Sequence, residues 1–137
     1  MDAHVESTGS FQELVGMELV EADGDHVVLS CPLRPELHQP YGILHGGVYC
    51  SLVESAASLA GALWFGDRGH VVGVANTTNF IRATREGTLT ATATPLQRGR
   101  TQQLWQVEIL DGEGRLAAHG QVRLANITDP VQIGAKS

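Results

Sequence analysis

Residues 46–65 read GGVYCSLVESAASLAGALWF, which is enough for about five helical turns, and only one of these residues, Glu54, is charged. Two glycines open the stretch, and alanine, leucine, valine and serine make up most of the remainder. Small and apolar residues lie all round the helix that this stretch predicts, so we expect it to be buried on every side. Another part of the chain must therefore wrap around it.

Extended segments supply the wrapping material. Residues 17–22 and 26–32 are apolar-rich runs joined by Asp-Gly-Asp, which predicts an antiparallel hairpin. Four longer runs separated by turn residues predict a meander of strands at residues 71–81, 88–96, 102–110 and 115–126. The capping-box spacing of Ser10 and Glu13 predicts a short helix at 11–15. The sequence thus predicts an α+β fold, a curved antiparallel sheet around one central helix.

Length and composition limit the class of protein. The 137 residues suffice for one domain, with a core expected at about 16–126. A composition of 42% hydrophobic and 18% charged residues is typical of a globular chain rather than a disordered one. The net charge of −6 argues against nucleic acid as a partner.

The sequence also predicts where the protein works. No apolar stretch approaches the length that crosses a bilayer, and residues 1–10 are acidic and polar where a signal peptide is basic and then apolar. We therefore expect no membrane partner and a cytoplasmic protein. Cys31 and Cys50 lie in apolar contexts without C-x-x-C spacing, which predicts buried thiols rather than a disulfide or a zinc site.

Glu54 is the leading catalytic candidate, because a carboxylate on a buried helix is costly unless it is paired or functional. Ser58 follows four residues later and shares its face of the helix. The alternative is that Glu54 occupies a gap where the helix meets solvent.

The start of the helix is a second candidate site. His45, Gly46 and Gly47 stand where backbone N–H groups lack intrahelical partners, and such groups favour a carbonyl oxygen that becomes an oxyanion. The alternative is that His45 merely caps the helix and the glycines make the turn. Nine residues place Glu54 about 13.5 Å beyond His45, on the opposite face. If both act on one substrate, the site must combine two subunits of a homodimer.

Several motifs together resemble the hotdog-fold acyl-CoA thioesterases. The strongest are QPYGILHGG at residues 39–47 and the Glu-Ser pair at 54–55 in a helix of small residues. Further matches are VVGV at 71–74, RATREG at 82–87, PLQRG at 95–99 and LWQVEI at 104–109. The likeness spans most of the chain and is greatest for the PaaI-like branch, with its 1,4-dihydroxy-2-naphthoyl-CoA and 4-hydroxybenzoyl-CoA enzymes.

This resemblance implies a mechanism and an assembly. Glu54 is expected to attack the thioester or activate water, and Gly46 to donate its N–H to the oxyanion. Gln39 and His45 are expected to orient the thioester, and Ser58 to position water. The family's site spans a dimer interface, and its dimers usually pair again into tetramers. No metal or redox cofactor is implied, since coenzyme A enters as part of the substrate.

Basic residues are concentrated in one stretch of this acidic chain. Four of them fall within nineteen residues that hold a single acid: Arg82, Arg85, Arg98 and Arg100. We expect them to meet the phosphates of CoA, with Arg82 first. Asn79 and Phe80 are expected to line the substrate site, and Phe80 stands where some aryl-CoA members carry histidine. The acyl group is therefore left as aryl or medium-chain.

Two other classes of function are weighed against hydrolysis of an acyl-CoA. A non-catalytic protein could hold an acyl-CoA or another lipid-like ligand in the same pocket. A purely structural assembly subunit would neither bind nor hydrolyse one. Tight binding of CoA esters without turnover would identify the first, and the absence of both would identify the second.

Overall fold

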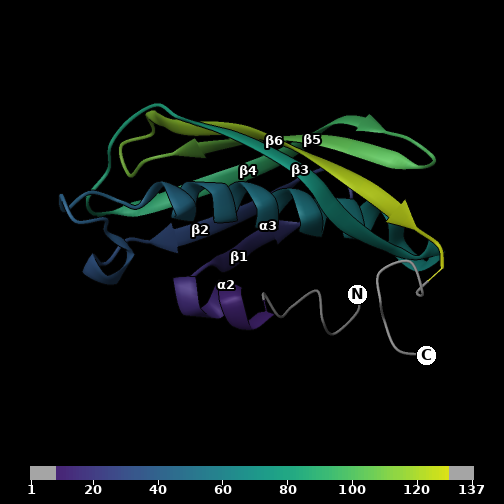
Figure 1. Cartoon of the computed structure of the whole chain (residues 1–137), viewed down its shortest axis with the longest axis horizontal. Helices are drawn as coiled ribbons and strands as arrows, with labels where there is room; N and C mark the ends of the chain where they lie inside the picture. Colours follow the sequence, from purple (N-terminus) through teal and green to yellow (C-terminus); the bar gives the residue numbers. More distant parts are fainter. Residues whose placement is uncertain (1–8, 130–137) are drawn as a thin grey trace.

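The structure is a computed structural model that describes residues 9–129. Its centre is helix α3, Gly46–Phe65, which lies lengthwise along one face of a six-stranded antiparallel sheet (Figure 1). The α+β fold expected from the sequence is confirmed, and it is the hotdog fold.

The strand positions agree closely with the sequence. The strands are β1 (Glu18–Ala22), β2 (Val27–Pro32), β3 (His70–Phe80), β4 (Thr88–Arg98), β5 (Gln102–Leu110) and β6 (Leu116–Ile127). The sheet order is β1-β2-β4-β5-β6-β3, and every neighbouring pair is antiparallel. The hairpin of β1 and β2 is confirmed.

The expected meander of four strands is only partly right. β4, β5 and β6 follow one another in the sheet, but β3 pairs with β6, from His70 opposite Ile127 to Phe80 opposite Ala118. β4 pairs instead with β2, and its buried residues, such as Leu89, continue the apolar face of the hairpin. Most residues of β3 are exposed, and a polar strand belongs at the end of a sheet, where less of it is buried.

The core lies between the sheet and α3. Strand residues alternate, so the buried ones form one apolar face against the helix; they include Leu29, Leu89, Ala91, Trp105, Val107, Ile109, Val122 and Leu124. Gly61 lets the helix approach closely, since a Cβ there would collide with the side chain of Leu124. Of the two cysteines expected to be buried, Cys31 is buried and Cys50 is partly exposed.

The sheet covers only one side of α3, so the expectation of a helix buried on every side is wrong for a single chain. Buried positions such as Leu52 and Ala56 face the strands. The opposite side carries Glu54 and Ser58, which are partly exposed, and Ala62, which is exposed. Six strands curve around one side of a helix, and residues 9–129 contain no second layer to cover the other.

The expectation that no stretch could cross a membrane also needs correction. By length and composition alone, Gly46–Arg68 would suffice for a span. Half of its apolar window is buried inside the protein, and core helices of soluble proteins pass the same test.

The short N-terminal helix α2 is Gly9–Val15. It begins before the expected residue 11, so Ser10 lies within the helix and does not cap it. Gln12 Nε2 donates a hydrogen bond of 3.4 Å to Ser55 Oγ and so fastens α2 beside the uncovered side of α3.

Candidate active site

Helix α3 begins with a histidine cap. His45 has an extended backbone, and its Nδ1 accepts a 2.8 Å hydrogen bond from the N–H of Gly47. Capping, one of the two roles left open for His45, is therefore what the structure shows. An Nδ1 that accepts carries no proton, so the neutral ring holds its proton on Nε2. The exposed His45 can thus still donate a hydrogen bond from Nε2 to a ligand oxygen.

The N–H of Gly46 is the free donor of this first turn. Among residues 9–129 no acceptor binds it, since the cap serves Gly47 and the N–H of Val48 donates to His45 O at 3.0 Å. The edge of the Phe80 ring lies against Gly46, where a Cβ would be 2.6 Å from the ring. A glycine is therefore needed at this close approach, and the donor opens into the pocket beside Phe80.

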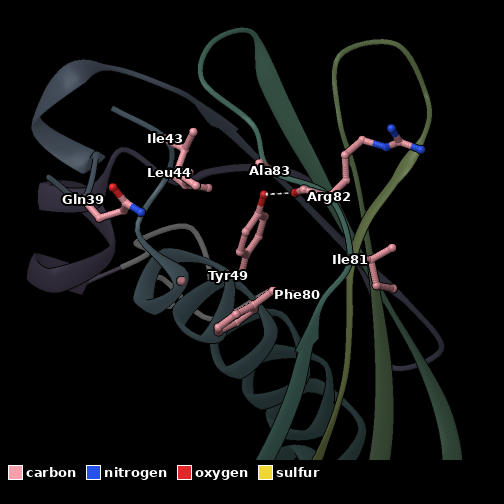
Figure 2. A pocket seen from close by; sticks show the side chains of 9 residues that line it. Gln39, Ile43, Leu44, Tyr49, Phe80, Ile81, Arg82 and Ala83 are labelled. Atoms are coloured by element: carbon pink, nitrogen blue, oxygen red, sulfur yellow. Dashed lines mark hydrogen bonds between the residues drawn. The ribbon is translucent and has the colours of Figure 1, made fainter. Parts of the chain in front are cut away.

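That pocket has a volume of about 260 Å³ and lies between the helix start, the loop before it and the end of β3 (Figure 2). Its apolar lining comes from Ile43, Leu44, Tyr49, Phe80 and Ile81. Gln39 and Arg82 lie on opposite walls, and the Arg82 guanidinium points outward (Figure 2). Gln39 Oε1 accepts from the N–H of Tyr41, which holds the Gln39 amide in place.

Glu54 lies on the uncovered side of α3 and is fixed by several groups. Asn76 Nδ2 donates to Glu54 Oε1 at 3.1 Å and to the carbonyl of Cys50 at 3.1 Å. Ser58 Oγ donates to Oε2 at 3.4 Å, as the shared face of the helix predicts. A Cβ at Gly73 would collide with Oε2, so that glycine makes room for the carboxylate. Glu54 is thus partly buried and paired, and the alternative of a simple gap facing solvent fits it less well.

Within one chain the predicted site residues form two groups. The pocket brings together Gln39, Gly46, Phe80 and Arg82, with His45 capping the helix beside them. Glu54 does not line this pocket, and its eight-residue separation from Gly46 corresponds to about 12 Å along the helix. The separation inferred from spacing is therefore present in the structure.

The arginines do not form one cluster. Arg82 and Arg85 lie in the connection between β3 and β4, whereas Arg98 ends β4 and Arg100 follows it. The eleven residues of β4 span roughly 35 Å in an extended strand, so residues close in sequence lie far apart.

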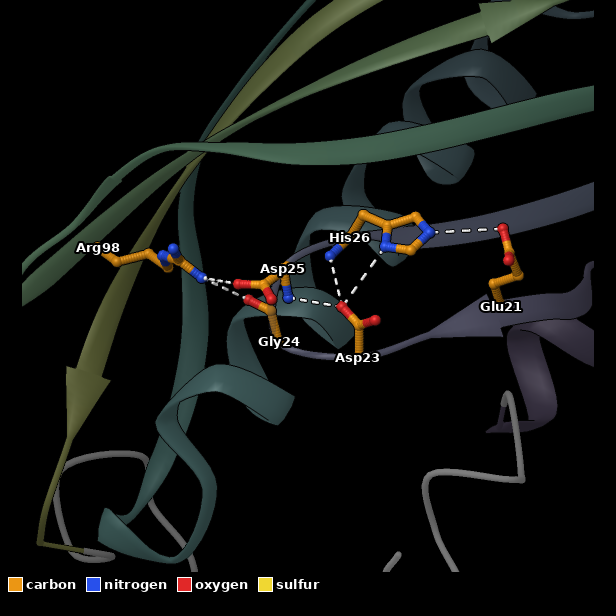
Figure 3. Close-up of polar contacts among 6 residues, drawn as sticks. All are labelled: Glu21, Asp23, Gly24, Asp25, His26 and Arg98. Carbon is orange, nitrogen blue, oxygen red and sulfur yellow. Dashed lines mark hydrogen bonds and ion pairs between the residues drawn. The ribbon is translucent and has the colours of Figure 1, made fainter.

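The contacts of the arginines differ as well. Arg98 donates 2.8 Å hydrogen bonds to Gly24 O and to Asp25 Oδ1 in the β1–β2 turn (Figure 3). Arg85 donates to Gly42 O at 3.2 Å, next to the pocket. Only Arg82 and Arg85 therefore stand near Gly46 in the same chain.

Asn79 is exposed on β3 opposite His119 in the neighbouring strand. Asn76 and Gly73 were missed in the sequence, because both contact Glu54 only through the packing of β3 beside α3. No short spacing marks that contact, although the polar composition of β3 is a signal that the strand is not ordinary core.

With this geometry in view, comparison with known proteins identifies the family. Residues 41–118 match the model of the Thioesterase superfamily. The chain belongs to this family and is a thioesterase superfamily hydrolase, as the resemblance in the sequence predicted.

Relatives and solved structures agree. The 1,4-dihydroxy-2-naphthoyl-CoA hydrolase of Escherichia coli (strain K12) is 37% identical over 101 residues, 74% of each chain. The proofreading thioesterase EntH of Cronobacter turicensis is 35% identical over 109 residues, 80% of each chain. The crystal structure of S. sahachiroi AziG has a TM-score of 0.86 and 50% identity, covering 88% of this chain and 98% of that one.

Proposed function

We propose that the protein hydrolyses acyl-CoA thioesters to a free acid and CoA. The observation that carries this proposal is the N–H of Gly46, which has no acceptor among residues 9–129 and opens into an apolar pocket at the positive end of α3. A thioester oxygen placed there would gain a hydrogen bond as it becomes negative. The name of the E. coli relative, a naphthoyl-CoA hydrolase, supports a CoA ester as the substrate.

In this mechanism Glu54 supplies the attack. Acting as a base, it takes a proton from water as the water oxygen adds to the thioester carbon. Acting as a nucleophile, it adds directly and forms an anhydride that water then opens. Either way the oxyanion accepts from Gly46, the C–S bond breaks, and the sulfur leaves as the CoA thiol after it takes up the proton. Ser58, already hydrogen-bonded to Glu54, positions the water.

The site is shared between two subunits. Gly46 and Glu54 lie about 12 Å apart along one helix, so Glu54 of one protomer serves the pocket of the other. The uncovered side of α3 and the free edge of β3 support this arrangement, because β3 ends the sheet and no strand in residues 9–129 pairs with its outer edge. We expect the dimers to pair again into tetramers.

The two parts of the substrate bind at different places. Arg82 and Arg85 meet the phosphates of CoA beside the pocket, and Gln39 and His45 orient the thioester. Arg98 and Arg100 could reach the same ligand only from another protomer. The apolar lining, including Phe80, suits an aryl or medium-chain acyl group, and Asn79 lies one residue before Phe80. We place the reaction in the cytoplasm.

The test is release of free thiol from a panel of aryl and aliphatic acyl-CoAs by the wild type and by Glu54→Ala. Turnover that falls at least 100-fold in the variant, with an unchanged melting temperature, supports the proposal. Full activity in the variant would overturn the role of Glu54. Tight binding of CoA esters without turnover would favour the non-catalytic alternative.

A further inference from the structure

Tyr49 lies one turn after Gly46 and has a buried side chain that the mechanism above does not use. Its hydroxyl is 2.8 Å from the carbonyl of Arg82 and 2.8 Å from Thr84 Oγ1 (Figure 2). Burial raises the pKa of the Tyr49 phenol, so the hydroxyl keeps its proton. It donates this proton to the Arg82 carbonyl, and the Thr84 hydroxyl therefore donates to the phenol oxygen.

These contacts fasten an otherwise exposed segment to the catalytic helix. Residues 81–83 are exposed between β3 and β4. The N–H groups of Ile81 and Arg82 donate to Ala117 O at 2.9 and 3.0 Å, which ties the segment to β6. The Tyr49 hydroxyl is its direct link to α3, the helix whose first residue is Gly46.

The ring of Tyr49 supports the same segment. Its centroid is 5.7 Å from that of Phe80, and the Phe80 ring lies against Gly46. Tyr49 thus contacts the chain on both sides of Ile81, by its ring and by its hydroxyl. Only the hydroxyl contacts would be lost in phenylalanine.

We propose that Tyr49 is a positioning residue that sets the location of Arg82 relative to the Gly46 N–H, so that one substrate binds both. This inference rests on the proposed function. Binding of the phosphates at Arg82 then helps to place the thioester at Gly46, which is how remote binding energy accelerates a reaction. Tyr49 itself touches no reacting atom.

The first test compares two substrates that carry the same acyl group. For an acyl-CoA, Tyr49→Phe should lower kcat/KM about tenfold, the loss expected for one or two buried hydrogen bonds. For the matching N-acetylcysteamine thioester, which lacks the nucleotide, the change should stay within about twofold. Equal losses on both substrates, or no loss on either, would overturn the proposal.

Matched variants separate positioning from general stability. Tyr41→Phe removes the same hydroxyl from a ring that is 86% exposed on the loop before the pocket, and it should behave as wild type. Thr84→Val should reproduce the loss and Thr84→Ser should retain activity, because serine keeps the hydroxyl. In an Arg82→Ala background, Tyr49→Phe should have no further effect on the CoA ester, whereas an additive effect would contradict action through Arg82.

A binding measurement keeps this inference separate from the proposed hydrolysis. Calorimetry with CoA alone needs no turnover, and Tyr49→Phe should weaken the Kd about threefold to tenfold. An unchanged Kd, or a wild type that does not bind CoA, would overturn the positioning role. If the wild type binds CoA and Glu54→Ala hydrolyses its esters normally, the proposed mechanism fails while the role of Tyr49 is still tested.

Discussion

Asn76 on β3 donates a 3.1 Å hydrogen bond to the carboxylate of Glu54 on α3. The amide of Asn76 is itself oriented, since Thr78 Oγ1 donates to its oxygen at 2.7 Å and its Nδ2 also donates to Cys50 O. The strand at the end of the sheet therefore fixes the direction of the one carboxylate on the central helix.

Asn76→Ala should lower kcat about tenfold and leave KM nearly unchanged, because it removes one hydrogen bond to a charged group without touching the pocket. Steady-state kinetics on the best acyl-CoA would measure both. Thr77→Ala, the next residue on the same strand and also exposed, is the matched control. Equal kinetics for the two variants would show that Glu54 does not need this hydrogen bond.

The donor at the helix start can be removed with little disturbance. Gly46 is the first residue of α3 and follows an extended His45, and proline is tolerated at such a position while lacking an N–H. Gly46→Ala is the control, because it brings the same Cβ against Phe80 and keeps the N–H. We expect kcat for Gly46→Pro to lie at least 100-fold below that of Gly46→Ala. Similar kcat values would exclude this N–H as the oxyanion donor.

Stability should depend on Asp111 at low pH. The N–H of Arg115, followed by that of Glu113 and the Arg115 side chain, holds the pKa of the Asp111 carboxyl below its usual value. A lowered pKa stabilises the fold above the unfolded value, near pH 4, and this stability is lost as the pH falls through the folded pKa.

Melting temperatures between pH 6 and pH 2.5 would test this relation. Asp111→Asn should melt lower than wild type near pH 6, and the difference should shrink as the pH falls. Glu86→Gln removes an exposed acid and serves as the control. A difference between Asp111→Asn and wild type that is the same at every pH would show that the loss is one of packing or hydrogen bonds rather than charge.

Local patterns predicted most of the fold. The fifth strand has the expected bounds of 102–110, and the central helix ends at Phe65 as its composition indicates. Alternation and turn residues are local properties of the chain, so the sequence reports them directly. The position of β3 depends instead on which strand best covers the remaining apolar edge, and that competition has no local signature.

The candidate site divides in the same way. The spacing of Gly46 and Glu54 on one helix was readable because helical geometry converts sequence distance into length. The four arginines were wrongly joined for the converse reason, since an extended strand carries neighbours such as Arg85 and Arg98 far apart. Asn76 and Tyr49 act through contacts between distant segments, which a single sequence does not reveal.

The shared site makes a prediction that neither variant alone can test. If Glu54 of one protomer serves Gly46 of the other, Glu54→Ala and Gly46→Pro should each be nearly inactive. Random mixing of equal amounts makes half of all dimers hybrids, and each hybrid has one site with both groups intact and one with neither. The mixture should therefore recover about a quarter of the wild-type activity.

Co-expression with two different tags would supply the hybrids, and purification over both tags would isolate them. The isolated hybrid should then show about half of the wild-type activity, because one of its two sites is complete. A hybrid of Glu54→Ala with Glu54→Gln is the control and should stay inactive. If the hybrid of Glu54→Ala and Gly46→Pro also stays inactive, the two groups do not meet across the interface. In that case a single chain would have to bring Glu54 to the pocket, which about 12 Å of rigid helix prevents, and Glu54 would have to be discarded as the attacking group.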